Sequence, residues 1–280
     1  MLNYFCLQRI LALLRKISIA VAVFLFACKK DPPVYKEEPY DIFLVAGQSN
    51  THFGLGLDPL IDTEDPRIEQ FGRFGTNSFK MIPAREPLDH LSRQDNCVGF
   101  ALTFAKAYED KYGKEGRRAL IIPCGQSRTS FNAGYWAVGG SLYTDAVSRT
   151  KYALSLNSKN KLVAILWHQG ESDVGWPNYQ AALDTMIVRM RKEINGDTNT
   201  YFLLGGLVPF WVSEDVSRQA WQTLIAGTPQ RVRHTAFVNP YYPFEIHKLV
   251  DTLIDVHYDA AGQRELGRRY FRVLDSLITH

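Results

Sequence analysis

The sequence has no marked excess of charge of either sign and no long basic run. Its 32 lysines and arginines face 29 acidic residues, which leaves a formal net charge of +3 over 280 residues. Nucleic-acid binding therefore has little support, since it depends on a concentrated positive surface. No internal repeat is visible. With 46% hydrophobic residues the chain can bury one substantial core, so we expect a single domain.

Cysteine is scarce, and its four positions are Cys6, Cys28, Cys97 and Cys124. The first two belong to an amino-terminal segment, so two remain for the folded part. A disulfide between Cys97 and Cys124 and a pair of buried free thiols both fit the sequence. No cysteine–histidine cluster has the spacing of a zinc site, and nothing indicates a metal or another cofactor.

The apolar segment from Ile17 to Ala27 is too short to span a bilayer comfortably, and it follows three basic residues: Arg9, Arg15 and Lys16. It ends in Leu25-Phe26-Ala27-Cys28, which resembles the lipobox of bacterial lipoproteins. That resemblance implies cleavage before Cys28 and a lipid on this cysteine. An uncleaved membrane anchor and a plain secretory signal are the alternatives.

We therefore expect a lipoprotein signal peptide over residues 1–27, a solvated tether over 28–39 and the folded domain over 40–280. The lipid would anchor the protein to a membrane outside the cytoplasm, in the periplasm or at the cell surface.

From Tyr40 onward, short apolar runs alternate with amphipathic segments. The runs predict strands at Asp41–Ala46, Ala119–Pro123, Leu162–Trp167, Tyr201–Val208 and Thr235–Val238, buried on both faces because they lack a period of two. The segments between them predict helices at Val98–Tyr112, Leu142–Leu156, Pro177–Asn195, Asp215–Ala226 and Ala260–Ile278. This alternation predicts an α/β fold, with a parallel sheet sandwiched between helices.

Residues 51–96 break this rhythm, since they contain several Gly, Pro and Asp residues and no sustained period. A loop of this length in a compact domain is usually a binding loop or disordered. Because the segment follows Ser49 directly, we expect it to shape a substrate site.

Three polar sites stand at predicted strand ends or just before the last helix. Gly47-Gln48-Ser49-Asn50 follows the first strand, Trp167–Asp173 includes the end of the third, and Asp255–Asp259 precedes the helix. Parallel α/β folds place their reactive groups at the carboxyl ends of strands. The Ser49 hydroxyl needs a base, and His257 is a candidate for it. The three sites together suggest an ester hydrolase that uses a serine.

The acid that would orient the imidazole is either Asp255 or Glu171. Asp255 stands two residues before His257, a spacing that places both side chains on one side of extended backbone. An oxyanion would need donors held in place beforehand. The candidates are the backbone N–H of Ser49, the side-chain amide of Gln169 and a backbone N–H between Gly125 and Ser127.

Four blocks occur in the order of a known pattern: Gly47–Asn50, Pro123–Gly125, Trp167–Asp173 and Val256–Gln263. They resemble the blocks of the sialate O-acetylesterase-like carbohydrate esterases, a branch of the SGNH/GDSL hydrolase superfamily. Segments 86–89 and 140–143 are also typical of this branch. The resemblance covers roughly residues 40 to 275.

The resemblance implies the SGNH hydrolase fold, a flavodoxin-like three-layer α/β/α sandwich with a central parallel sheet. It also implies metal-free removal of acetyl groups from acetylated polysaccharide or sialic acid, through an acetyl-enzyme. Ser49 becomes the nucleophile, His257 the base, and Gln169 an oxyanion donor. The expected substrate contacts are Gln48, Asn50, Arg128 and Trp136.

Two departures from the family pattern stand out. Ser127-Arg128 replace the usual paired glycines of the second block, which can shift the backbone donor. The aspartate usually found three residues before the histidine is Ile254 here, with Asp255 one residue closer. Because some members use the glutamate of the third block, both acids stay open, with a preference for Glu171.

Two other functions also fit these residues. One is a non-catalytic carbohydrate-binding lipoprotein of the same fold. The other is a related hydrolase that acts on lipid or thioester acyl groups.

Overall fold

The computed structural model describes residues 38–247 and 256–279. The predicted signal peptide, Cys28 and Asp255 therefore lie outside the described residues. Within them, seven strands form one sheet in the order β4-β3-β6-β1-β7-β8-β9. Their bounds are β1 Tyr40–Gly47, β3 Ile68–Phe71, β4 Met81–Pro83, β6 Arg118–Gly125, β7 Lys161–His168, β8 Tyr201–Gly205 and β9 Thr235–Val238.

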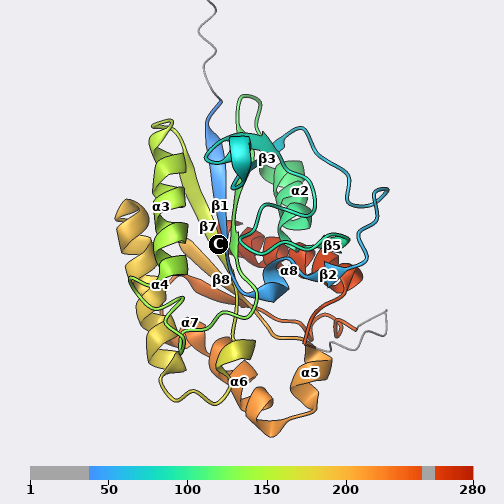
Figure 1. Cartoon of the computed structure of the whole chain (residues 1–280), viewed down its shortest axis with the longest axis vertical. Helices are drawn as coiled ribbons and strands as arrows, with labels where there is room; N and C mark the ends of the chain where they lie inside the picture. Colours follow the sequence, from blue (N-terminus) through green and yellow to red (C-terminus); the bar gives the residue numbers. More distant parts are fainter. Residues whose placement is uncertain (1–37, 248–255, 280) are drawn as a thin grey trace, which may run out of the picture. The chain divides into compact units, whose positions relative to one another are not determined.

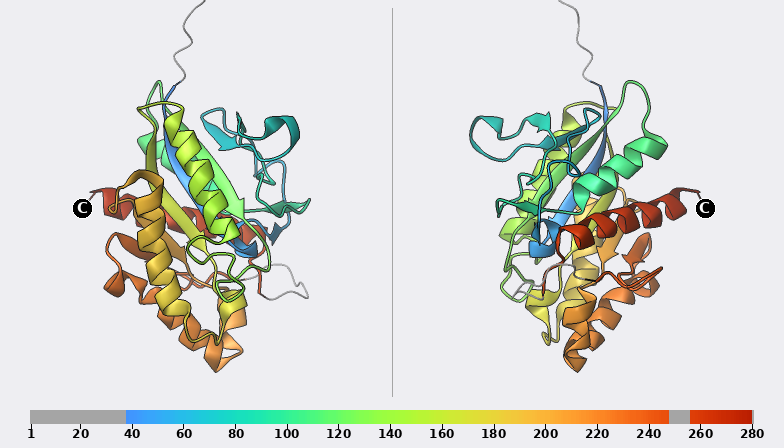
Figure 2. Two further views of the ribbon diagram at one scale, coloured as in Figure 1. Left: turned by 60° about the vertical axis from the view of Figure 1, so that its left-hand side comes forward. Right: turned by 90° about the vertical axis from the view of Figure 1, so that its right-hand side faces the viewer.

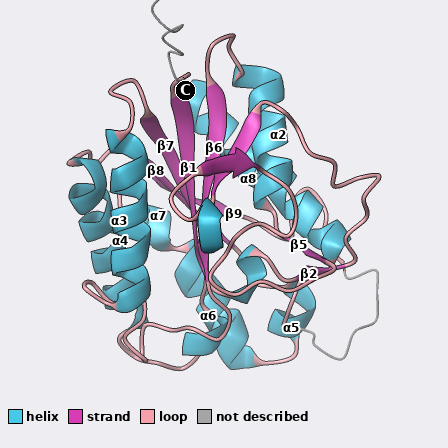
Figure 3. Ribbon diagram, turned by 45° about the horizontal axis from the view of Figure 1, so that its top comes forward, coloured by secondary structure: helices cyan, strands magenta, loops and turns pink. Residues whose placement is uncertain are grey.

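Helices cover both faces of this sheet (Figures 1 and 3). One face carries α3 (Ser141–Ser155) and α4 (Tyr179–Asn195), and the other carries α2 (Ala101–Tyr112) and α8 (Ala260–Thr279), as the two views of Figure 2 show. The three short helices between β8 and β9 are α5 (Pro209–Ser213), α6 (Val216–Ala226) and α7 (Thr228–Arg231). This arrangement confirms the predicted three-layer α/β/α sandwich.

Strand β1 shows why the apolar runs lack a period of two. Ile42 and Leu44 pack with the core under α3 and α4, whereas Phe43 and Val45 pack with the core under α2 and α8. All four side chains are fully buried. Both faces of a central strand are covered in this architecture, so every position along it is apolar.

The sheet is not purely parallel. β4 pairs antiparallel with β3 at one edge, while every other neighbouring pair is parallel. β3 and β4 come from residues 51–96, which the sequence predicted to be loop. The segment also contains η2 (Gly75–Asn77) and β2 (Gly54–Leu55), which pairs with β5 (Cys97–Val98). The strands are too short to produce a visible period, and this accounts for the wrong prediction.

The other element boundaries lie close to those predicted. α2 begins at Ala101 and not at Val98, because Cys97 and Val98 belong to β5. β8 ends at Gly205 and not at Val208, because the chain leaves the sheet toward α5. Gly196 ends α4 in the left-handed conformation at φ 74°, which favours glycine.

Candidate active site

Strand register brings the polar blocks to one edge of the sheet. Gly47, the last residue of β1, is paired with Gly125 of β6 on one side and with His168 of β7 on the other. The residues that follow these three positions therefore start from neighbouring points at the carboxyl ends of parallel strands. This is the edge at which such folds bind their ligands.

The backbone at Gly47, where the chain leaves β1, has a conformation that requires glycine. Its φ of 131° is rarely adopted by other residues, and a Cβ atom there would lie 2.0 Å from the carbonyl oxygen of His168. The turn then enters the short 3-10 helix η1 (Ser49–Thr51). Ser49 thus stands as the first residue of a helical turn directly above the sheet.

Ser49 and His257 lie within hydrogen-bonding distance, although 208 residues separate them in sequence. Nε2 of His257 is 2.8 Å from Oγ of Ser49. Phe53 packs against the imidazole, with a ring-centroid distance of 4.5 Å. A neutral imidazole at this distance can take the serine proton, so the pair has the geometry of a nucleophile and its general base.

Of the two candidate acids, the structure describes only Glu171. Asp255 lies outside the described residues, so its pairing with His257 stays a prediction. The Glu171 side chain is only 3% exposed, and its Oε1 accepts a hydrogen bond from Nδ2 of Asn50 at 2.5 Å. Among the described residues, no hydrogen bond joins Glu171 to His257. Burial raises the pKa of Glu171 to about 7, although the Asn50 amide opposes this shift.

Asn50 is not a substrate contact. Its side chain is fully buried, and its amide is used within the protein: Nδ2 also donates to the carbonyl oxygen of Val256, and Oδ1 accepts from the backbone N–H of Tyr258. The prediction that Asn50 touches substrate is therefore wrong, because no part of its amide is left to face a ligand.

The predicted oxyanion donors differ in what they already bind. The Ser49 N–H donates to no acceptor among the described residues, as expected of the first residue of a helical turn. The Gly125 N–H is instead committed to Nδ1 of buried His90 at 2.9 Å, which contradicts its assignment. The Gln169 amide donates to Oδ2 of Asp173 at 2.6 Å and lies 3.4 Å from the carbonyl oxygen of Thr129.

The Ser127 N–H is also engaged, since it donates to Oγ of Ser92 at 2.7 Å. The next residue, Arg128, is exposed and holds a φ of 60°, a conformation favoured by glycine. Its backbone N–H meets no acceptor within the described part of the chain. Arg128 thus adopts a conformation that favours glycine, and its N–H, unlike that of Gly125, is not already bonded to an acceptor among the described residues.

Two of the predicted substrate contacts have clear positions. Gln48 accepts a hydrogen bond on Oε1 from the backbone N–H of Ser172, which fixes its side chain between the first and third blocks. Trp136 is fully buried, and its Nε1 donates to Oγ1 of Thr129. Trp136 therefore belongs to the core, and the prediction that it contacts sugar is wrong.

Three further histidines surround the site, and the sequence offered no reason to group them. His52 and His90 stack at a ring-centroid distance of 4.9 Å, and His168, which belongs to the third block, is fully buried. Burial lowers the pKa of His52 to about 3, with a further contribution from His257, and burial lowers the pKa of His168 to about 3. Burial lowers the pKa of His90 as well, so the neutral form of each of the three rings is favoured in the folded protein.

Other predictions concern cysteine, metal and membrane. Cys97 and Cys124 are both buried and free, so the disulfide alternative is wrong. No group of three or more metal-ligating side chains occurs within residues 38–247 and 256–279. In the same ranges no helix has the length and apolar character needed to cross a bilayer. The predicted lipidation at Cys28 lies outside the described residues.

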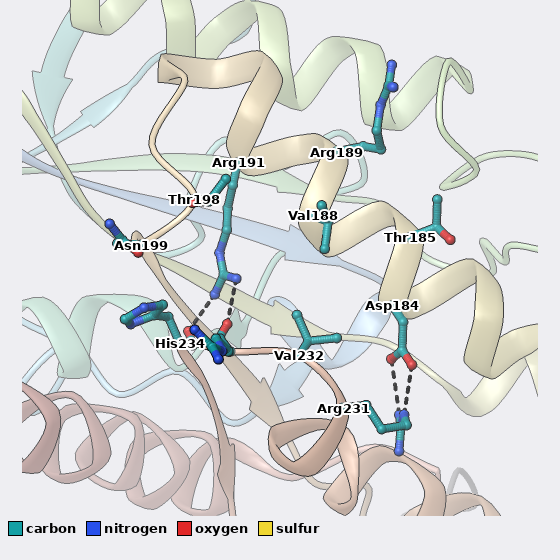
Figure 4. Close-up of a pocket in the computed structure, with 11 residues that line it drawn as sticks. Asp184, Thr185, Val188, Arg189, Arg191, Thr198, Asn199, Arg231, Val232 and His234 are labelled. Atoms are coloured by element: carbon teal, nitrogen blue, oxygen red, sulfur yellow. Dashed lines mark hydrogen bonds and ion pairs between the residues drawn. The ribbon is translucent and has the colours of Figure 1, made fainter.

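A pocket of about 640 Å³ lies away from this site, between α4 and the segments that lead into β8 and β9 (Figure 4). Two of its four arginines, Arg191 and Arg231, are engaged within the protein. Arg231 forms an ion pair with Asp184, and Arg191 donates to the backbone carbonyls of Arg233 and His234. These contacts give Arg191 and Arg231 a structural role.

The α/β/α fold and the Ser49–His257 pair at the carboxyl ends of its parallel strands have the arrangement of a hydrolase that uses a serine nucleophile. The family model for carbohydrate esterases described as sialic acid-specific acetylesterases matches residues 39–276. The chain therefore belongs to this family of ester hydrolases, as its blocks predicted.

Three relatives illustrate the similarity. A protein of Escherichia coli (strain K12) described as a probable 9-O-acetyl-N-acetylneuraminic acid deacetylase is 28% identical over 223 residues, which cover 61% of this chain and 68% of that protein. The crystal structure of NanS has a TM-score of 0.74 at 20% identity, and the match covers 87% of this chain and 98% of the NanS chain. A carbohydrate acetylesterase from Xanthomonas citri has a TM-score of 0.59 at 16% identity, with coverage of 82% and 54%.

Proposed function

We propose that this protein is a carbohydrate O-acetylesterase in which Ser49 is the nucleophile and His257 the general base. The proposal rests above all on the 2.8 Å contact between Oγ of Ser49 and Nε2 of His257. As Oγ attacks the acetyl carbonyl, its proton passes to Nε2, and the carbonyl oxygen becomes negative. The Ser49 and Arg128 N–H groups would receive this charge.

The reaction then proceeds in two steps. Collapse of the tetrahedral intermediate breaks the ester bond, and the imidazolium returns its proton to the sugar oxygen that leaves. The acetyl-enzyme is next attacked by water, which His257 deprotonates, and the second collapse releases acetate and restores the Ser49 hydroxyl.

The nucleophile is tested with Ser49→Ala. The variant should fold like the wild-type protein and lose at least about 1,000-fold in release of 4-nitrophenol from its acetate ester, since the covalent route is gone. Circular dichroism and a thermal melt serve as the folding control. Turnover at the wild-type rate in this variant would remove Ser49 from the mechanism.

For the substrate, we propose the O-acetyl groups of a sialic acid or an acetylated polysaccharide. The family description and the name of the bacterial relative favour the first. Acetate release from a panel of O-acetylated sialic acid, xylan, mannan and pectin would rank them. An acyl-chain series on one alcohol would also test the lipid or thioester alternative, because a site made for acetyl should fall off sharply beyond propionyl.

We also propose that Cys28 carries a lipid that anchors the enzyme outside the cytoplasm. The support is the apolar segment from Ile17 to Ala27, which follows three basic residues, and the Leu25-Phe26-Ala27-Cys28 sequence that ends it. Incorporation of labelled palmitate into the wild-type chain expressed in a bacterium, and its loss in Cys28→Ala, is the expected result. Equal labelling of both chains would show that the cysteine is not the lipid site.

A further inference from the structure

The Asn50 side chain holds the backbone on both sides of the catalytic base. Its Nδ2 donates to the carbonyl oxygen of Val256 at 2.9 Å, and its Oδ1 accepts from the N–H of Tyr258 at 3.1 Å. These are the residues directly before and after His257. Because Asn50 also directly follows Ser49, one side chain fixes the distance between the nucleophile and the base.

The same loop is held from its other side by elements that do not touch the nucleophile. The single proton of the Tyr258 hydroxyl faces two acceptors, the carbonyl oxygens of Gly206 and Leu207, at 2.8 and 3.0 Å. Nε2 of Gln263, in the first turns of α8, donates to the backbone carbonyl of Asn50 at 3.0 Å. Among these contacts, the Asn50 amide joins the first block directly to the backbone on both sides of His257.

Glu171 determines which way the Asn50 amide faces. Its Oε1 accepts from Nδ2 of Asn50 at 2.5 Å, as an oxygen of an ionised carboxyl or the carbonyl oxygen of a protonated one can do. The nitrogen of the amide must then point toward Glu171 and Val256, and the oxygen toward the Tyr258 N–H. If the amide were reversed, its oxygen would face two hydrogen-bond acceptors, Oε1 of Glu171 and the carbonyl oxygen of Val256. Its nitrogen would face a donor, the N–H of Tyr258.

From this geometry we propose that Asn50 and Glu171 are positioning residues, with Glu171 acting on His257 through Asn50 and not as the acid that pairs with the imidazole. The inference rests on the proposed function, since it concerns the same Ser49–His257 pair. It assigns a role to a buried glutamate that the family pattern offered as a triad acid. The burial of Asn50 and Glu171 keeps both away from substrate.

The sharpest test compares Glu171→Gln with Glu171→Ala on 4-nitrophenyl acetate. Glutamine keeps an oxygen acceptor for the Asn50 amide, so kcat should stay within about fivefold of wild type, whereas alanine removes the acceptor and should lower kcat about 30-fold. KM should change less than about twofold in both, because neither residue contacts the ester. A triad acid would behave differently, since replacing it by its amide costs about 10,000-fold.

Asn50→Ala should lower kcat about 100-fold, the loss expected when a catalytic group moves by about 1 Å. Asn50→Asp should be at least as impaired, since it places a carboxylate against Glu171 and the Val256 carbonyl. The double variant Asn50→Ala with Glu171→Ala should be no worse than Asn50→Ala alone, because Glu171 acts through the amide that is already gone.

Asn160 offers a matched control. Its side chain also accepts from one backbone N–H, that of Tyr40 at 2.7 Å, and donates to one backbone carbonyl, that of Ala153 at 2.8 Å. It stands just before β7, whereas the active site follows the other end of that strand. Asn160→Ala should lower the melting temperature and leave kcat at the wild-type value.

The pH profile of kcat/KM separates positioning from acid catalysis. Glu171→Gln should leave the inflection of His257 within about 0.5 units of wild type, whereas loss of a paired carboxylate would lower it by at least about one unit. A shifted inflection, a 10,000-fold loss in Glu171→Gln, or additive losses in the double variant would each overturn the inference. A wild-type enzyme without esterase activity, or an active Ser49→Ala, would instead overturn the proposed function.

Discussion

The two sides of Ser49 are built differently. On the side of the base, residues of the sequence blocks supply hydrogen bonds that place His257: Asn50 holds its backbone neighbours, and Ser49 contacts its imidazole. On the oxyanion side, the 125–128 loop is held by residues from the segment before α2. Gly125 donates to His90, and Ser127 donates to Ser92.

This difference shows where each half of the chemistry is encoded. The position of the base depends on residues in short motifs that can be recognised in the sequence. The oxyanion side depends on His52, His90 and Ser92, which lie in a stretch without periodicity and act through neutral rings and a hydroxyl. Two backbone N–H groups that the motif suggested as oxyanion donors serve to hold the loop instead.

Removal of the Ser92 hydroxyl should loosen the 125–128 loop on the oxyanion side of Ser49 and leave His257 in place. Its Oγ accepts from the Ser127 N–H at 2.7 Å and lies 3.0 Å from Nε2 of His52. Ser92→Ala should lower kcat about tenfold, or about 1.4 kcal/mol in the barrier, by loosening the loop that carries the Arg128 donor. Steady-state kinetics on 4-nitrophenyl acetate would measure this, with KM nearly unchanged.

Ser127→Ala is the control for that variant. It removes only the hydroxyl, which contacts Ser92 and His52, and leaves the backbone hydrogen bond in place. The expected change in kcat is less than about twofold. A rise in kcat in Ser92→Ala would show that the freed Ser127 N–H, and not that of Arg128, is the second oxyanion donor.

Substitution of Arg128 tests the backbone conformation of the loop on the oxyanion side. The residue holds a φ of 60°, which costs about 1 kcal/mol for a side chain with a Cβ and nothing for glycine. Arg128→Gly should therefore be about 1 kcal/mol more stable than Arg128→Ala in urea unfolding. Equal stabilities would show that the loop relaxes out of the left-handed conformation when the side chain is cut back.

The smallest effect concerns Glu86, which supports the oxyanion side through the 86–92 segment. Burial raises its pKa to about 8, although its oxygens accept from the backbone N–H groups of Leu88 and Gly99. The protonated form is thus favoured in the folded protein. Its contribution to stability is complete below the ordinary value of 4.5 and is lost as the pH rises through about 8.

The melting temperature of the wild-type protein should consequently fall between pH 5 and pH 9, a range set by that raised value. Glu86→Gln should flatten this dependence. Glu171, whose pKa is also raised, would keep part of the slope in the variant. Parallel curves for the two proteins would show that Glu86 is not the group that titrates.

The layered fold and the Ser49–His257 pair could be predicted because they follow from local patterns. Apolar runs predicted the central strands, and parallel pairing at Gly47, Gly125 and His168 brings their ends together. The pairing of β3 with β6 could not be predicted, since a four-residue strand has too few positions to show a pattern.

The hydrogen-bond partners of the site could not be read from residue types. Gly125, Gln169 and Asn50 all have groups able to bind an oxyanion or a substrate. Whether those groups are free depends on long-range neighbours, such as His90 for Gly125 and Asp173 for Gln169. Trp136 likewise looks like a loop aromatic until the structure shows its ring packed against Trp167.

The most direct measurement is the intact mass of the protein after exposure to a fluorophosphonate, which reacts only with an activated serine. The wild-type domain should gain the mass of one phosphonyl group, on the peptide that contains Ser49. Ser49→Ala should gain none, and His257→Asn should react at least about 100-fold more slowly, because the base is gone. Labelling of Ser49→Ala at the wild-type rate, or no labelling of the wild type, would contradict the account.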